Sequence, residues 1–109
     1  MESELATKRL SALAQTGRLA VFRLLVKAGP NGIAAGEIAR SLDLPPNTLS
    51  AQLTVLANAG LIANRRAGRS IIYSANYEGM NELLVYLMED CCQGRPELCL
   101  PPAKEAACC

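Results

Sequence analysis

Apolar residues recur every three or four positions through most of the chain, which is the spacing of one face of an α-helix. This periodicity predicts five helices, which cover residues 5–14, 18–28, 35–42, 47–59 and 78–92. Two segments rich in helix-breaking residues, Gly-Pro-Asn-Gly at 29–32 and Leu-Pro-Pro at 44–46, separate the second, third and fourth helices. The sequence therefore predicts a mainly α fold.

The apolar stripes assign an inward face to each of the first two helices. The residues expected to face the core are Ala6, Leu10, Leu13 and Ala14 in the first helix and Leu19, Phe22, Leu25 and Val26 in the second. Short polar residues at a helix start accept hydrogen bonds from free backbone N–H groups. We expect Thr16 to cap the second helix in this way, and Asn47 or Thr48 to cap the fourth.

Residues 61–74 depart from the helical spacing. Two runs of extended type, residues 61–66 and 69–74, flank Ala67-Gly68, and a glycine-containing turn between such runs is typical of a β-hairpin. Three arginines lie at or beside the expected tip, namely Arg65, Arg66 and Arg69. The chain is thus predicted to combine about five helices with one small hairpin.

The composition fits one small domain with an aliphatic core. The chain has 109 residues, of which 50% are hydrophobic and 4% aromatic, and it has no Trp. We divide it into a domain over residues 1–93 and a Cys-containing tail over residues 94–109. No apolar run reaches the roughly 18–20 residues of a membrane span, and the acidic N-terminus lacks a secretory h-region. We therefore expect a cytoplasmic protein.

The net charge of +1 conceals an asymmetry along the chain. Residues 5–75 carry nine basic and two acidic residues, a net charge of +7, whereas residues 76–109 carry a net charge of −4. A basic body favours a polyanionic partner, and the alternative is an ordinary solvated surface.

The third and fourth predicted helices are joined by a tight turn. Such a pair can place its second helix in the major groove of DNA. Opposite or beside the apolar stripe of that helix lie small groups that can approach base edges, namely Asn47, Ser50, Ala51 and Thr54. Arginines at the hairpin tip are suited to phosphates or to a narrow minor groove. We predict that the chain binds double-stranded DNA.

A set of short motifs resembles the ArsR/SmtB family of winged helix-turn-helix repressors over about residues 5–75. The matching positions are Leu13-Ala14, Arg18-Leu19, Leu24-Leu25, Glu37-Ile38-Ala39, Leu49-Ser50, Leu53, Val55-Leu56, Ala59-Gly60-Leu61-Ile62, Arg66, Gly68-Arg69 and Tyr73-Ser74. The resemblance implies a winged helix-turn-helix fold and a homodimer formed by the first and last helices. It also implies a palindromic operator that is released when an inducer binds, and it adds Thr48 and Gln52 to the expected DNA contacts.

The chain departs from the family pattern at three places. Ala51 and Gln52 stand where many members carry Arg and His, which weakens any transfer of specific base contacts. Ala34 and Gly36 occupy the positions of the Cys-x-Cys pair of arsenic- and cadmium-responsive members. The chain has no His, so the zinc-type site of the last helix cannot form.

All five cysteines lie in the last nineteen residues, and Cys91, Cys92 and Cys99 form the tighter cluster. Clustering at one end, without an export signal, indicates metal or redox chemistry rather than a disulfide scaffold. Three thiols without a nitrogen ligand favour a thiophilic centre. Trivalent arsenic needs only three thiols, whereas structural zinc needs a fourth ligand. We expect Cys91, Cys92 and Cys99 to bind arsenic(III) as inducer.

Several alternatives remain open at this stage. Antimony(III) and methylarsenite are alternative inducers, and Cys92 with Cys99 can close a loop in a repressor that senses oxidants or reactive sulfur. Cys91 also continues an apolar stripe, as a buried small hydrophobe would, and Cys108 and Cys109 end a tail. A winged helix that binds only proteins is a further alternative. An enzyme is disfavoured because no His, phosphate-binding loop or activated cysteine is present.

Overall fold

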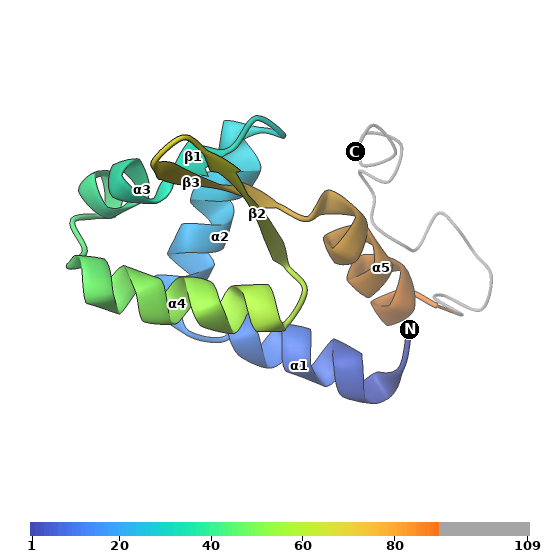
Figure 1. Ribbon diagram of the computed structural model, residues 1–109. Coiled ribbons are helices and arrows are strands. Elements are labelled where there is room, and N and C mark those ends of the chain that lie inside the picture. The colour runs from blue at the N-terminus through green and yellow to red at the C-terminus, as the bar shows by residue number, and fades with distance from the viewer. Residues whose placement is uncertain (90–109) are drawn as a thin grey trace.

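A computed structural model describes residues 1–89 of the chain, which form five helices and three short strands (Figure 1). The elements are α1 Ser3–Leu13, α2 Thr16–Ala28, β1 Ile33–Ala34, α3 Ala35–Leu42, α4 Pro46–Asn58, β2 Ile62–Ala67, β3 Ser70–Ala75 and α5 Tyr77–Leu87. The predicted helices and hairpin are confirmed. None of the helices described is long and apolar enough to cross a membrane.

The strands form one antiparallel sheet in the order β1-β3-β2. The hairpin closes with Ala67 opposite Ser70, which leaves a two-residue turn of Gly68 and Arg69. Gly68 has a φ of 63°, a value that favours glycine at the first central position of such a turn. The sequence did not predict β1, because its two residues become a strand only by pairing with Tyr73 and Ile72 of β3.

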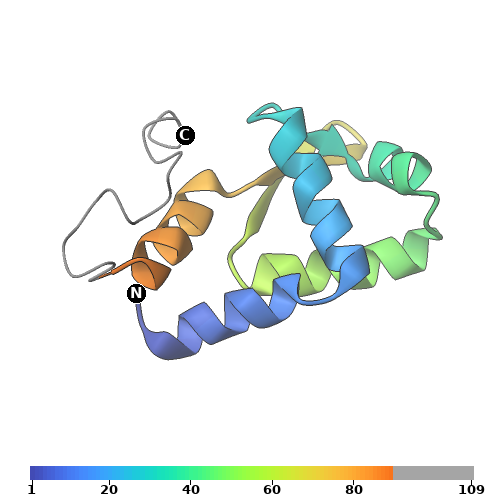
Figure 2. The ribbon, with the colours of Figure 1, turned by 180° about the vertical axis from the view of Figure 1, so that it is seen from behind.

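The core lies between α2, α3, α4 and the start of the hairpin. Its largest fully buried side chains are Val21, Leu25, Ile38, Leu56 and Leu61, and Leu83 of α5 is fully buried outside this cluster. Seen from behind, α2 spans from the junction of α1 and α4 to the sheet (Figure 2). This packing leaves α3, α4 and the hairpin at one side of the molecule and α1 and α5 at the other.

The predicted inward faces of α1 and α2 are only partly correct. In α1 the buried residues are Ala6, Arg9 and Ala12, while Leu10 is 42% exposed. In α2, Val21 is buried together with Phe22 and Leu25, whereas Leu19 and Val26 are exposed. The buried face of each helix is therefore rotated slightly from the predicted face. The prediction fails because exposed apolar side chains, such as Leu10, Leu19 and Val26, extend the apolar pattern beyond the side that packs.

The predicted caps are wrong at both helix starts. Gln15, not Thr16, caps α2, and its side chain accepts a hydrogen bond of 2.8 Å from the backbone N–H of Arg18. Helix α4 has no side-chain cap, so neither Asn47 nor Thr48 fills that role. Instead α4 begins with Pro46, which has no backbone N–H to satisfy and a φ already suited to a helix.

Helix α5 starts one residue earlier and ends sooner than predicted. Asn76 caps it by accepting from the backbone N–H of Gly79, and the helix ends at Leu87. The prediction that it continues to Cys92 is wrong. Its last turn has no basic residue, and Glu89 follows the C-cap Met88, so a carboxylate lies near the negative end of the helix dipole.

Candidate nucleic-acid interface

A sharp turn fixes α4 relative to α3. Asp43 adopts a left-handed conformation with a φ of 53°, and the backbone N–H of Leu44 donates to the carbonyl of Ala39 over 2.9 Å. Leu44 packs against the core, and Pro46 then starts α4. The turn therefore sets two short helices at a defined angle, as in a helix-turn-helix unit.

The core anchors α4 through Leu49, Leu53 and Leu56, which are at most 4% exposed. Most of the remaining surface of the helix faces solvent. Five of the predicted DNA-contacting residues are exposed there, namely Asn47, Thr48, Ser50, Ala51 and Thr54. The Thr54 hydroxyl donates to the carbonyl of Ser50 over 2.9 Å, so it can offer a ligand only its acceptor capacity.

Gln52 does not join these exposed residues. Its side chain is half-buried and lies over Gly17 at the start of α2, so closely that a Cβ on that glycine would clash with the Gln52 amide nitrogen. The Gln52 Oε1 atom is buried and has no hydrogen-bond partner within residues 1–89. The structure thus places Gln52 between two helices rather than on the exposed face of α4.

The three hairpin arginines differ in their surroundings. Arg65 donates from Nη2 to the carbonyl of Asn31 over 3.1 Å, which ties the strand to the loop after α2. The side chains of Arg66 and Arg69 are exposed and make no hydrogen bond or ion pair with another described residue. Their guanidinium groups are therefore available for an anionic ligand.

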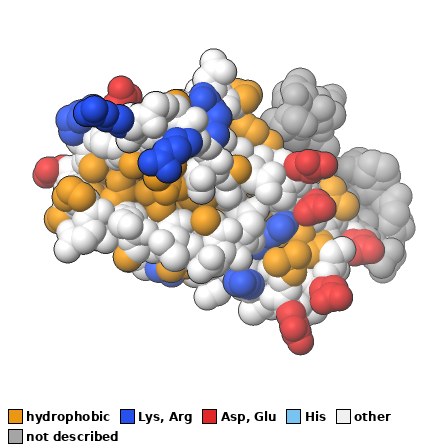
Figure 3. All heavy atoms as spheres, viewed as in Figure 1, with side chains coloured by type: hydrophobic (Ala, Val, Ile, Leu, Met, Phe, Trp, Pro, Cys, Tyr) orange, Lys and Arg blue, Asp and Glu red, His pale blue; other side chains and the backbone are white. Residues whose placement is uncertain are grey.

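A groove of about 440 Å³ separates α4 from the hairpin. Leu49, Leu53, Ile71 and Tyr73 contribute apolar side chains to its lining, and Arg69 contributes a cation. Figure 3 shows Lys and Arg side chains gathered over α3 and the hairpin, with hydrophobic side chains beside them. Acidic side chains gather over the α1 and α5 end of the same view. The exposed face of α4 thus borders the basic end of the molecule.

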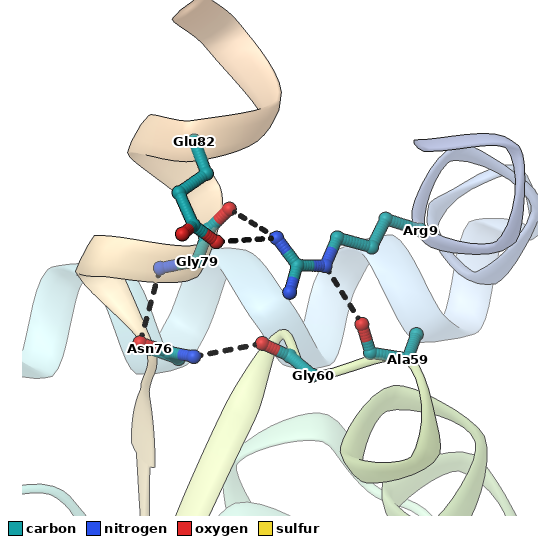
Figure 4. Close-up of polar contacts among 6 residues, drawn as sticks. All are labelled: Arg9, Ala59, Gly60, Asn76, Gly79 and Glu82. Atoms are coloured by element: carbon teal, nitrogen blue, oxygen red, sulfur yellow. Dashed lines mark hydrogen bonds and ion pairs between the residues drawn. The ribbon is translucent and has the colours of Figure 1, made fainter. Parts of the chain in front are cut away.

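A buried arginine joins three elements where α1 meets α5 and the turn after α4 (Figure 4). Arg9 of α1 donates from Nε to the carbonyl of Ala59 over 2.9 Å and from Nη1 to the carbonyl of Gly79 over 2.7 Å. Its Nη1 also lies 3.3 Å from Oε1 of Glu82. Arg9 therefore connects α1, the turn after α4 and the first part of α5.

Asn76 reinforces the same junction. Its Oδ1 accepts from the backbone N–H of Gly79 over 3.1 Å, and its Nδ2 donates to the carbonyl of Gly60 over 2.9 Å. We call Arg9, Asn76 and the backbone groups that they bind the polar hub. Sequence reasoning counted Arg9 only as a positive charge. The available signal was its place midway between Ala6 and Ala12, which gives the spacing of one helix face.

The predicted arsenic ligands Cys91, Cys92 and Cys99 lie outside the described residues. Within residues 1–89, no group of three or more His, Cys, Asp or Glu side chains is placed to hold a metal ion.

Known proteins share this architecture. A family model described as a helix-turn-helix domain matches residues 10–65. The transcriptional regulator YgaV of Escherichia coli is 30% identical over 90 residues, which are 83% of this chain and 89% of YgaV. The regulator NmtR of Mycobacterium tuberculosis is 40% identical over 65 residues, which are 60% of this chain and only 52% of NmtR.

The description of one similar solved structure includes its oligomeric state. Mb0332 from Mycobacterium bovis is described as a homodimeric winged helix-turn-helix DNA-binding domain and a possible ArsR-family regulator. The two chains are 28% identical with a TM-score of 0.65, and the match covers 80% of each.

Proposed function

Because this chain belongs to the winged helix-turn-helix transcriptional regulators of the ArsR type, we propose that it is a repressor that leaves its operator when trivalent arsenic binds. At the coarser level it is a DNA-binding regulator rather than an enzyme, as its relatives are. The proposal adds the mode of DNA binding, the oligomeric state and the inducer.

The exposed polar face of α4 beside two uncommitted arginines carries the DNA-binding part. With α4 in the major groove, Asn47, Thr48 and Ser50 present donors and acceptors to base edges. Arg69 lines the groove that borders α4, Arg66 pairs with the groove residue Ile71 in the hairpin, and both arginines bind phosphates or the adjacent minor groove. Gln52 is assigned no base contact, because its amide is packed over Gly17.

A homodimer through α1 and α5 places two such helices on a palindromic site. Leu84, Val85 and Leu87 of α5 are 46–59% exposed, and Leu10 of α1 is 42% exposed. A partner copy would remove this apolar surface from water. The description of Mb0332 as homodimeric supports the same assembly here.

The inducer part rests on the three cysteines that follow α5 in the sequence. As(OH)₃ exchanges its three hydroxyl groups for the thiols of Cys91, Cys92 and Cys99, so three As–S bonds form and three water molecules leave. No electron is transferred, and the exchange needs no prior ionisation of the thiols. Because α5 ends only four residues before Cys91, a change in this segment acts directly on the end of the proposed dimer helix.

The experiment is fluorescence anisotropy of labelled DNA from upstream of the gene, titrated with reduced protein and then with arsenite. We expect tight binding that a few equivalents of arsenite reverse. The triple variant Cys91→Ser, Cys92→Ser and Cys99→Ser is expected to bind DNA equally well and to ignore arsenite. Cys108→Ser with Cys109→Ser is the matched control and should still respond.

The outcomes separate the inducer from the repressor. Binding that ignores arsenite but is reversed by peroxide or persulfide, through the same three cysteines, would replace arsenic by a redox signal. Response to antimonite or methylarsenite, tested in the same way, identifies the preferred metalloid. Failure of the unmodified protein to bind any DNA at moderate salt would contradict the repressor itself.

A further inference from the structure

A second basic site borders α4 on the side away from the hairpin. It is a hollow of about 280 Å³ between α1, the start of α2 and the second half of α4. Lys8 and Ser11 of α1, Arg18 of α2 and Asn58 of α4 line it, and no acidic residue does. The hollow therefore combines two cations with two neutral side chains that can donate hydrogen bonds.

The Arg18 guanidinium is held in place. Its Nε donates to the carbonyl of Ala12 over 2.6 Å, and its Nη2 lies 3.4 Å from the carbonyl of Ser11. These bonds satisfy carbonyls at the C-terminal end of α1 and leave further N–H groups of the guanidinium available. The positive charge is thus oriented before any ligand arrives.

Lys8 is exposed and uncommitted. Glu4 precedes it by one helical turn, but the only ion pair within residues 1–89 joins Arg9 and Glu82. The Lys8 ammonium also makes no hydrogen bond to another described residue. Its charge is therefore free to meet an anion at the mouth of the hollow.

The hollow shares a face with the residues expected to contact bases. Asn58 follows Asn47 by eleven residues, which is about three helical turns, so both project from the same side of α4. The major groove of DNA is bounded by two backbone strands. When α4 enters the groove, one strand lies towards each flank of the helix. Arg69 of the hairpin lies on one flank, and Lys8 and Arg18 lie on the other.

We infer that the hollow of Lys8, Ser11, Arg18 and Asn58 binds a phosphate of the DNA backbone, on the flank of α4 opposite the hairpin. The inference rests on the proposed function, because it requires α4 to enter the major groove. It extends the DNA contact surface to α1, a helix that sequence reasoning assigned only to dimer formation. A phosphate contact of this kind contributes affinity without sequence preference.

The test compares Lys8→Gln with Lys27→Gln, which removes the same charge from an α2 position that lines neither the hollow nor the groove. The dissociation constant for operator DNA and for unrelated DNA is measured against salt concentration. For Lys8→Gln we expect the slope of log Kd against log salt to fall by about 0.9, and binding to both DNAs to weaken by the same factor. For Lys27→Gln we expect an unchanged slope.

The results distinguish failure of this inference from failure of the proposed function. If the unmodified protein binds DNA with a steep salt dependence and Lys8→Gln keeps that slope, the inference fails while the proposed function stands. If the unmodified protein binds no DNA, both fail. Thermal unfolding of Lys8→Gln should match that of the unmodified protein, because the side chain makes no internal bond.

Discussion

Arg9 and the hairpin arginines carry the same guanidinium group in opposite surroundings. Arg9 is 7% exposed and meets two backbone carbonyls and one carboxylate. Arg66 and Arg69 are exposed and meet no acceptor in the part of the chain that the structure describes. Arg9 therefore holds the fold together, whereas the hairpin arginines are available for a ligand. A count of positive charges cannot separate these roles.

The difference follows from where acceptors are available. The carbonyl of Ala59 lies at the C-terminal end of α4, where no intrahelical partner is available, whereas the carbonyl of Gly79 in the first turn of α5 accepts from Arg9 through its second lone pair. Burying the Ala59 carbonyl requires a donor, and the long arm of Arg9 supplies it from a third helix. At the hairpin tip the backbone N–H and carbonyl groups of β2 and β3 pair with each other. No buried carbonyl there requires a donor from a side chain.

The largest expected effect comes from Arg9→Met, which keeps an apolar stem of similar reach and removes every donor. Two charge-assisted hydrogen bonds would be lost and the buried Ala59 carbonyl would be left without a partner, so we expect the free energy of unfolding to fall by about 3 kcal/mol or more. Urea denaturation measures it. Arg23→Met, at an exposed site on α2, is the matched control and should stay within about 0.5 kcal/mol. A loss below about 1 kcal/mol for Arg9→Met would show that the polar hub does not stabilise the fold.

The reverse result is expected from Arg66→Ala combined with Arg69→Ala. The stability should change by no more than about 0.5 kcal/mol, because neither side chain makes an internal bond. The salt slope of DNA binding should fall by about 1.8, and the affinity at moderate salt by about tenfold or more. If the double variant bound DNA normally but had a lower free energy of unfolding, Arg66 and Arg69 would stabilise the fold as Arg9 does and would not contact DNA.

Local pattern predicted the parts of the site that depend on neighbours in sequence. Helix α3 has its predicted bounds, α4 is shifted by one residue, and the hairpin turns where glycine permits a positive φ. These elements are determined by apolar spacing, by proline at a helix start and by glycine at a turn. The exposed side of α4 follows directly, because its apolar stripe is unambiguous.

What the sequence did not predict depends on residues far apart in the chain. The partners of Arg9 lie 50 and 70 positions away, so nothing local distinguishes it from a surface arginine. Gln52 lies at the edge of the apolar stripe of α4 by sequence, and only the close approach of α2 at Gly17 determines that its amide is covered. The end of α5 was set too late because the stripe through Met88 and Cys91 outweighed the unfavourable carboxylates that follow.

The smallest effect is expected from Glu82→Gln. This variant also best distinguishes the ion pair of Arg9 from its hydrogen bonds to carbonyls. The Glu82 side chain is 59% exposed, so water and salt screen its attraction to the guanidinium. In Glu82→Gln the amide oxygen can still accept from Nη1, and we expect the stability to fall by no more than about 0.5 kcal/mol, with less effect at high salt. A double-mutant cycle with Arg9→Met should then give a coupling energy of similar size. A coupling as large as the whole Arg9→Met effect would mean that the ion pair, and not the two carbonyls, keeps this arginine in the interior. Arg9 would then resemble the hairpin arginines in requiring an anion, with the difference that its anion comes from the same chain.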